Sequence, residues 1–148
     1  RRIGGRVGTV DVTLVNGVIG DPLLHLRPRH QRRSLLFDIG AGARLSARLS
    51  MTATPLLEGV RELADQGFVT GASDRNWAGY GASVTLAPSI GATDRALLTD
   101  PQTSGGLLVA CAPEAVDDVL DIFRRDGFEQ ASVIGELLAG EPCIHVEA

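Results

Sequence analysis

The sequence predicts an α+β fold, and three observations support this prediction. The last two-thirds of the chain alternates helical and extended patterns, and the best helical pattern covers residues 113–125. Two short apolar segments, 131–137 and 143–146, then close the chain as strands. The first fifty residues are β-branched and turn-rich, without helical periodicity. This order of elements predicts a sheet with helices on one face.

Length and composition indicate one domain with a real core. The chain has 148 residues, of which 44% are hydrophobic, and a mean hydropathy of +0.12. No apolar run is long enough to span a bilayer, and no signal peptide is visible, so we expect a cytoplasmic protein. Cys111 and Cys143 form no CxxC motif, which argues against a disulfide framework or a zinc site.

Charge divides the chain near residue 50. Residues 1–50 carry nine Arg and three Asp, whereas residues 51–148 carry five Arg and fifteen acidic residues, and there is no lysine. A break of this kind predicts two segments of different origin, 1–50 and 51–148. The arginine-rich cluster at 27–33 has the charge to touch nucleic acid, but we favour an exposed hairpin tip.

The first segment is predicted to be β-rich. A β-branched, alternating pattern over 8–15 ends at the turn signal Asn16-Gly17. Two further short strands are expected at 23–26 and 34–38, on either side of the arginine-rich cluster.

In the second segment, apolar spacing predicts a helix over 56–66 that Gly67 ends, and residues 74–91 are expected to be loop. A helical turn capped by Thr93 is expected over 92–98. Residues 107–110 read as a buried strand, and the strands 131–137 and 143–146 as a hairpin. The helix over 113–125 has a predicted buried face made of Val116, Val119, Leu120 and Phe123.

The stretch Asp100-Pro101-Gln102-Thr103-Ser104-Gly105-Gly106-Leu107-Leu108 stands out in this segment. Pro101 fixes a turn, and two adjacent glycines allow close approach of the backbone. A loop rich in N–H and hydroxyl donors at a strand edge can hold an anion such as phosphate. The alternative is an ordinary turn before a strand.

This nonapeptide resembles the signature near the C-terminus of the selenophosphate synthetases (selenide, water dikinases), of the same superfamily as the aminoimidazole ribonucleotide synthetases. Upstream, Gly71-Ala72-Ser73-Asp74-Arg75-Asn76 resembles the family's GGT-x-RN motif. The resemblance runs from about Thr54 to about Val146 and implies an incomplete C-terminal domain of that superfamily. It also implies a loop close to the nucleotide phosphates, made of Asp100, Gln102, Thr103, Ser104, Gly105 and Gly106. Gly71, Arg75 and Asn76 form the secondary family motif.

The resemblance implies conversion of ATP, selenide and water to selenophosphate, AMP and phosphate, with magnesium. In that family the catalytic cysteine or selenocysteine, the lysine and the metal-binding aspartates lie mainly in the N-terminal domain. None is identifiable here, so we assign no catalytic residue and no metal ligand, and expect no tight binding of ATP or Mg²⁺ by this chain alone. The chain is therefore expected to be a fragment that is not competent alone.

Residues 7–50 weakly resemble the opening strands of metallo-β-lactamase-fold hydrolases. The HxHxDH metal motif of those enzymes is missing, since the only histidines are His25, His30 and His145. Two alternatives to a synthetase fragment stay open. One is a non-catalytic module that pairs with a complete synthetase, and the other is the remnant of such a hydrolase.

We expect self-association, or pairing with an N-terminal synthetase domain, and no membrane partner. An incomplete domain should leave a sheet edge unpaired, and strands from an unrelated fold are not expected to match its register. The sequence leaves open whether the break near residue 50 is a fusion, a deletion or a frame shift. It also leaves open whether residues precede Arg1.

Overall fold

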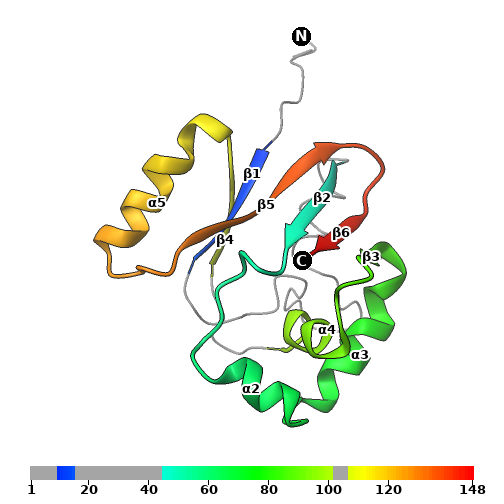
Figure 1. The fold of residues 1–148 in the computed structure, drawn as a ribbon. Helices are drawn as coiled ribbons and strands as arrows, with labels where there is room; N and C mark the ends of the chain where they lie inside the picture. Colours follow the sequence, from blue (N-terminus) through cyan, green and yellow to red (C-terminus); the bar gives the residue numbers. More distant parts are fainter. Residues whose placement is uncertain (1–9, 16–44, 102–106) are drawn as a thin grey trace, which may run out of the picture.

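The computed structural model describes residues 10–15, 45–101 and 107–148, which form a mixed sheet with helices packed on it (Figure 1). The sheet has six strands in the order β3-β6-β2-β5-β1-β4. The strands are β1 Val10–Val15, β2 Leu45–Ser50, β3 Val84–Leu86, β4 Leu107–Cys111, β5 Ser132–Ala139 and β6 Ile144–Glu147. The helices are α2 Val60–Asp65, α3 Gly71–Tyr80, α4 Ala92–Leu98 and α5 Val116–Arg125, with 3₁₀ turns η1 Gly81–Ser83 and η2 Pro113–Ala115.

The two closing strands do not form the hairpin that the sequence predicts. β2 lies between them, antiparallel to β5 and parallel to β6. Ala47 of β2 is the Cα partner of both Leu137 and Ile144. The hairpin prediction is wrong because it overlooked β2, whose own alternating pattern fits it for a central position.

One face of the sheet carries the main core. Alternate residues point to opposite faces of a strand, so Leu45, Ala47 and Leu49 of β2 lie on the same side, each at most 7% exposed. Ile144 and Val146 of β6 lie beside them, each 1% exposed. These side chains pack with buried residues of α2, α3 and α4, namely Ala64, Tyr80, Leu97 and Leu98.

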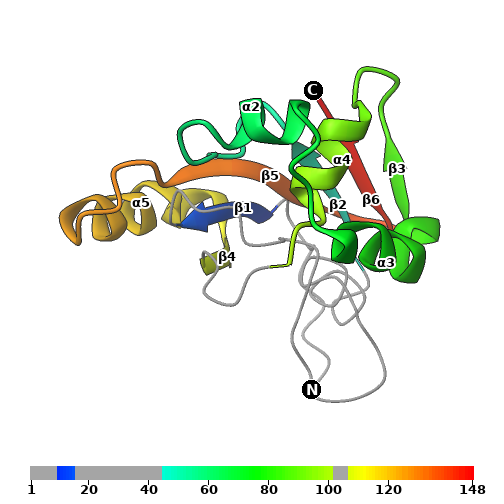
Figure 2. The ribbon, with the colours of Figure 1, turned by 90° about the horizontal axis from the view of Figure 1, so that it is seen from below.

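Helix α5 packs in a second apolar cluster, on the other face of the sheet. Val116 and Leu120 of α5 pack with Ala131 and Val133, whereas the next residue of β5, Ile134, belongs to the main core. Val133 and Ile134 belong to different clusters, so α5 lies on the face of the sheet opposite the main core. Figure 2 shows α2 above β5 and α5 at the far end of β5, beside β1. The expectation of helices on one face only is therefore wrong.

The helix predicted over 113–125 is confirmed, as η2 followed by α5. Its predicted buried face is confirmed for Val116 and Leu120, which are buried, and for Phe123, which packs against the same cluster. Val119 is only half-buried and does not belong to this cluster. The helix predicted over 56–66 is shorter, because Gly59 at φ 77° precedes the first helical residue, Val60. Thr93 does not cap α4, since its hydroxyl donates instead to Asp65 Oδ1 (2.7 Å).

The loop predicted over 74–91 is wrong over residues 74–86, which belong to α3, η1 and β3. The buried residues of α3 are Ser73, Asn76 and Tyr80, spaced three and four apart. A helix with this spacing presents one face to the protein, but here the face is mainly polar. Apolar periodicity cannot detect such a helix.

Strand β4 exists as predicted, but it is not buried. It is one edge of the sheet, and Leu107 is 57% exposed. On its inner side β4 pairs with β1, which also pairs with β5, both antiparallel. A strand of the N-terminal segment therefore does match the register of the sheet, contrary to our expectation.

Other expectations for the first segment, including the strands at 23–26 and 34–38 and the arginine-rich cluster, lie outside the described residues. Within the described ranges, none of the helices combines the length and apolar character needed to cross a bilayer.

Candidate functional site

The two sequence motifs that we singled out meet at the junction of α3 and α4. Gly71, Arg75 and Asn76 lie on α3, and Asp100 follows the end of α4. The Thr70 hydroxyl, just before α3, donates to Asp100 Oδ1 at 3.0 Å. The start of the nonapeptide is therefore joined to the N-terminus of the helix that carries the second motif.

A buried side-chain amide connects α3 to the end of α4 at this junction. Asn76 Nδ2 donates to the Thr99 carbonyl oxygen at 2.9 Å, and both residues are only 1% exposed. The Ser73 hydroxyl donates to the Ala96 carbonyl oxygen at 3.3 Å. Both bonds reach carbonyl groups at the C-terminal end of α4, where helix carbonyls lack the usual N–H donor four residues later. They place the residue before Asp100 at a fixed distance from α3.

Arg75 lies on the solvent-exposed side of α3, whereas Asn76 is buried. The Arg75 side chain is exposed, and no carboxylate of the described residues lies within ion-pair distance of its guanidinium. Its guanidinium reaches back toward Gly71, the first residue of α3, and a guanidinium at a helix N-terminus is suited to bind an anion. The remaining predicted residues, Gln102, Thr103, Ser104, Gly105 and Gly106, lie outside the described residues, so the phosphate-proximal loop stays a prediction.

The surface next to Asp100 is mostly apolar. A hollow of about 210 Å³ is lined by residues of α2, of the segment after α2, and of α4; they are Val60, Leu63, Ala64, Phe68, Val69, Thr70, Ala96, Leu97 and Asp100. Three of them are strongly exposed: Phe68 (71%), Val69 (51%) and Leu63 (50%). We call Leu63, Phe68 and Val69 the apolar rim. Its chemistry suits contact with another protein surface better than with a phosphate.

No group of three or more His, Cys, Asp or Glu side chains that could hold a metal ion occurs among the described residues. A thiol and an imidazole nevertheless lie side by side, and our reading of the sequence missed this pair. Cys143 Sγ lies 3.1 Å from His145 Nε2. The signal was available, because residues two apart on a strand share a face.

Comparison with known proteins defines the class of this domain. The family described as "AIR synthase related protein, C-terminal domain" matches residues 36–146. The chain therefore belongs to this family, which confirms the fold class expected from the nonapeptide and its flanks. The match begins before residue 50, so residues 36–50 of the first segment fall within it. The division of the chain at residue 50 stays a prediction.

The relatives have a more specific name. The chain is 57% identical over 109 residues to the selenide, water dikinase of Burkholderia pseudomallei (strain K96243), covering 74% of this chain and 31% of the relative. It is 52% identical over 109 residues to that of Pseudomonas straminea, covering 74% and 30%. The enzyme of Rhizobium meliloti (strain 1021) is 46% identical over 109 residues, covering 74% and 31%. The chain thus spans about a third of the length of these relatives.

Proposed function

We propose that this chain acts as the C-terminal part of a selenide, water dikinase, the enzyme that uses ATP and water to convert selenide into selenophosphate, AMP and phosphate. The observation that carries the proposal is the junction of the two motifs through Asn76 and Thr99. It anchors the loop that starts at Asp100, in a chain 57% identical to such an enzyme over 109 residues.

In this proposal the chain positions the phosphate groups of ATP and supplies none of the reacting groups. Transfer of a phosphoryl group depends mainly on orienting and neutralising the phosphate oxygens. Arg75, with the loop Asp100–Gly106, supplies a cation and hydrogen-bond donors for this purpose. The reacting groups and the Mg²⁺ ligands belong to the part of the enzyme that precedes the matched third.

The part of these relatives that lies outside the match is also the expected partner of this domain. The apolar rim borders Asp100, so a domain that holds ATP against the loop would cover the rim at the same time. A non-catalytic assembly role, in which the chain pairs with a complete synthetase, is the second candidate, and the same exposed rim favours it.

A mixing experiment tests the proposal and separates the two candidates. The full chain is added to the Burkholderia pseudomallei enzyme cut back to remove its matching third, and selenide-dependent AMP formation is measured. We expect no AMP from either piece alone and AMP from the mixture. Arg75→Gln should lower AMP formation by the mixture, whereas exposed Gln130→Ala should not. If the chain binds the intact enzyme and never restores the shortened one, the assembly role replaces the catalytic one.

A further inference from the structure

The pair formed by Cys143 and His145 plays no part in the function proposed above. Cys143 immediately precedes β6 and His145 lies within it, so both side chains are on the same face as alternate residues. Cys143 Sγ and His145 Nε2 are 3.1 Å apart, which is hydrogen-bond distance for a sulfur atom. The Ser46 hydroxyl approaches the sulfur from β2 at 3.2 Å. A thiol, a base and a further hydrogen-bonding group therefore meet at one point.

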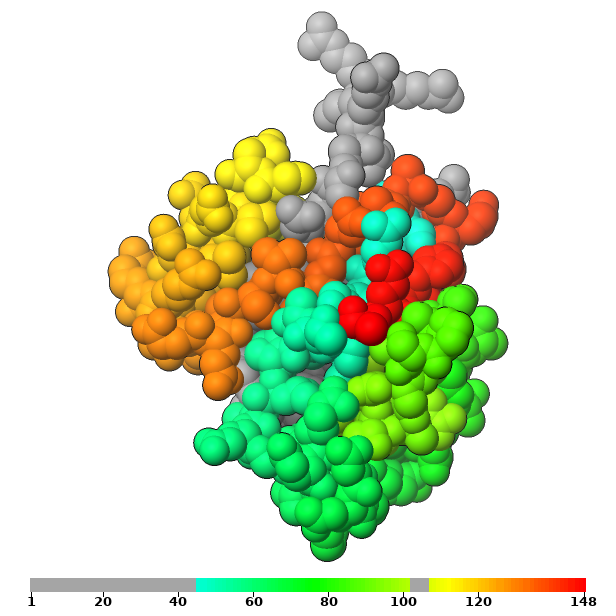
Figure 3. Space-filling view, viewed as in Figure 1, coloured from blue at the N-terminus to red at the C-terminus, as the bar shows by residue number. Residues whose placement is uncertain are grey.

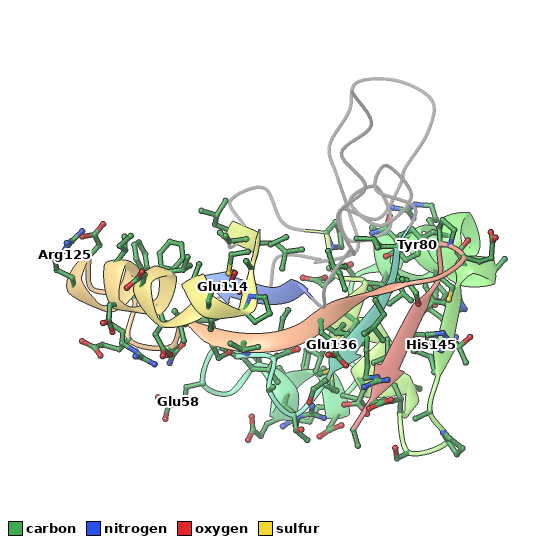
Figure 4. The ribbon with its side chains drawn as sticks, turned by 90° about the horizontal axis from the view of Figure 1, so that it is seen from above. Glu58, Tyr80, Glu114, Arg125, Glu136 and His145 are labelled. Carbon is green, nitrogen blue, oxygen red and sulfur yellow. The ribbon has the colours of Figure 1, made fainter. Side chains whose placement is uncertain are left out.

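The charged side chains next to His145 are paired with one another. On β2, Arg48 is the Cα partner of His145, and it is ion-paired with Glu136 of β5 (2.6 Å) and Glu147 of β6 (3.5 Å). On the other side, β3 presents the uncharged Thr85 opposite His145. Figure 4 shows His145 on β6 and Glu136 on β5. Among the described residues, the Cys143 thiol lies within hydrogen-bond distance of the His145 ring.

This face of the sheet can be reached by small molecules. The segments β5, β2 and β6 lie side by side at the surface in Figure 3, without a helix over them. His145 is exposed and Cys143 is half-buried. The other cysteine, Cys111, is also half-buried, but it packs against the apolar cluster of α5. Cys111 therefore has similar burial, and the one histidine of the described residues, His145, contacts Cys143 instead, which makes Cys111 an internal control.

We propose that Cys143 is a nucleophilic thiol that reacts with peroxides, with His145 as its base. His145 Nε2 takes the thiol proton, and the thiolate sulfur then attacks one oxygen of hydrogen peroxide. The S–O bond forms while the O–O bond breaks. The leaving hydroxide takes the proton from the imidazolium and departs as water. Sulfur is oxidised by two electrons to sulfenic acid, and the peroxide is reduced by two electrons.

Alkylation of the full-length chain tests whether His145 acts as the base for Cys143. The rate of alkylation by iodoacetamide is measured between pH 6 and pH 10. The rate at Cys143 is measured in a Cys111→Ser variant, and the rate at Cys111 in a Cys143→Ser variant. At about pH 6.5 we expect Cys143 to react at least about tenfold faster than Cys111, because only a thiolate is nucleophilic. His145→Asn, at an exposed position, should remove this advantage and leave the rate near pH 10 unchanged. Equal alkylation rates for the two cysteines at about pH 6.5 would overturn the proposal. A rate at Cys143 that stays the same in the His145→Asn variant would also overturn it.

Trapping of the product tests the oxidation itself. After brief exposure to hydrogen peroxide, the full chain is treated with dimedone, which reacts with sulfenic acid, and the modified residue is located by mass spectrometry. We expect the adduct on Cys143, much less on Cys111, and a loss of the Cys143 adduct in His145→Asn. An adduct on neither cysteine, or on both equally, would show that the pair is not a peroxide-reactive site.

Discussion

The side-chain amide of Asn76 donates a 2.9 Å hydrogen bond to the carbonyl oxygen of Thr99, a residue 23 positions later in the chain. Each residue is 1% exposed, so the bond lies out of contact with water. It connects the middle of α3 to the end of α4, directly before Asp100. This buried contact acts together with the bonds from Ser73 and Thr70 to set the position at which the candidate loop leaves the core.

Replacing Asn76 with Ala should destabilise the protein. The substitution leaves the Thr99 carbonyl buried without this donor, and a lost buried hydrogen bond of this kind costs about 1–3 kcal/mol. Urea unfolding would show the loss as a lower midpoint. Gln130→Ala removes an exposed amide and is the matched control, with an expected change below about 0.5 kcal/mol. Equal midpoints for the two variants would mean that the Asn76 bond does not hold the α3–α4 junction.

Gly135 should tolerate alanine poorly. It lies in β5 opposite Leu49, and a Cβ atom there would come within 2.1 Å of the Arg48 carbonyl oxygen. The backbone of β2 or β5 would have to move, and overpacking of this kind costs about 1–3 kcal/mol.

Gly140→Ala is the matched control, because its Cβ would meet only Ser46 Cβ, at an ordinary 3.6 Å. Thermal unfolding of both variants compares the two positions. A Gly135→Ala variant as stable as Gly140→Ala would contradict the close approach of β2 and β5.

The apolar rim should drive association of the isolated chain. Phe68 is 71% exposed and stands beside Val69 and Leu63, both at least half exposed. Burying apolar surface is favourable by about 25 cal/mol per Å², so an uncovered rim promotes contact between copies. Sedimentation over a dilution series should show reversible association, and Phe68→Ser should weaken it. A monomer at every concentration, with Phe68 intact, would show that the rim does not bind a second copy.

The sequence predicted the fold class and several elements correctly, because these depend on local patterns. Apolar spacing placed the helix over 113–125, and β-branched alternation placed β1. The errors have a different origin. The polar inner face of α3 hid that helix, and the hairpin prediction paired neighbours in sequence when β2 lies between them. Strand order depends on non-local packing, which no local pattern specifies.

The site was predictable only in part. The nonapeptide and the Gly71–Asn76 motif could be found from their residues, but not the bond from Asn76 that joins them. The strand predicted over 143–146 already placed Cys143 and His145 on the same face, but the two residues were not compared at that point.

The most direct measurement of the central claim is selenide-dependent AMP formation by a chimera. Residues 36–146 of this chain replace the matching third of the Burkholderia pseudomallei selenide, water dikinase, which avoids dependence on two separate pieces associating. We predict that the chimera forms AMP only when selenide is present, while the 148-residue chain alone forms none. A chimera that folds, binds ATP and forms no AMP with selenide would contradict the proposed function.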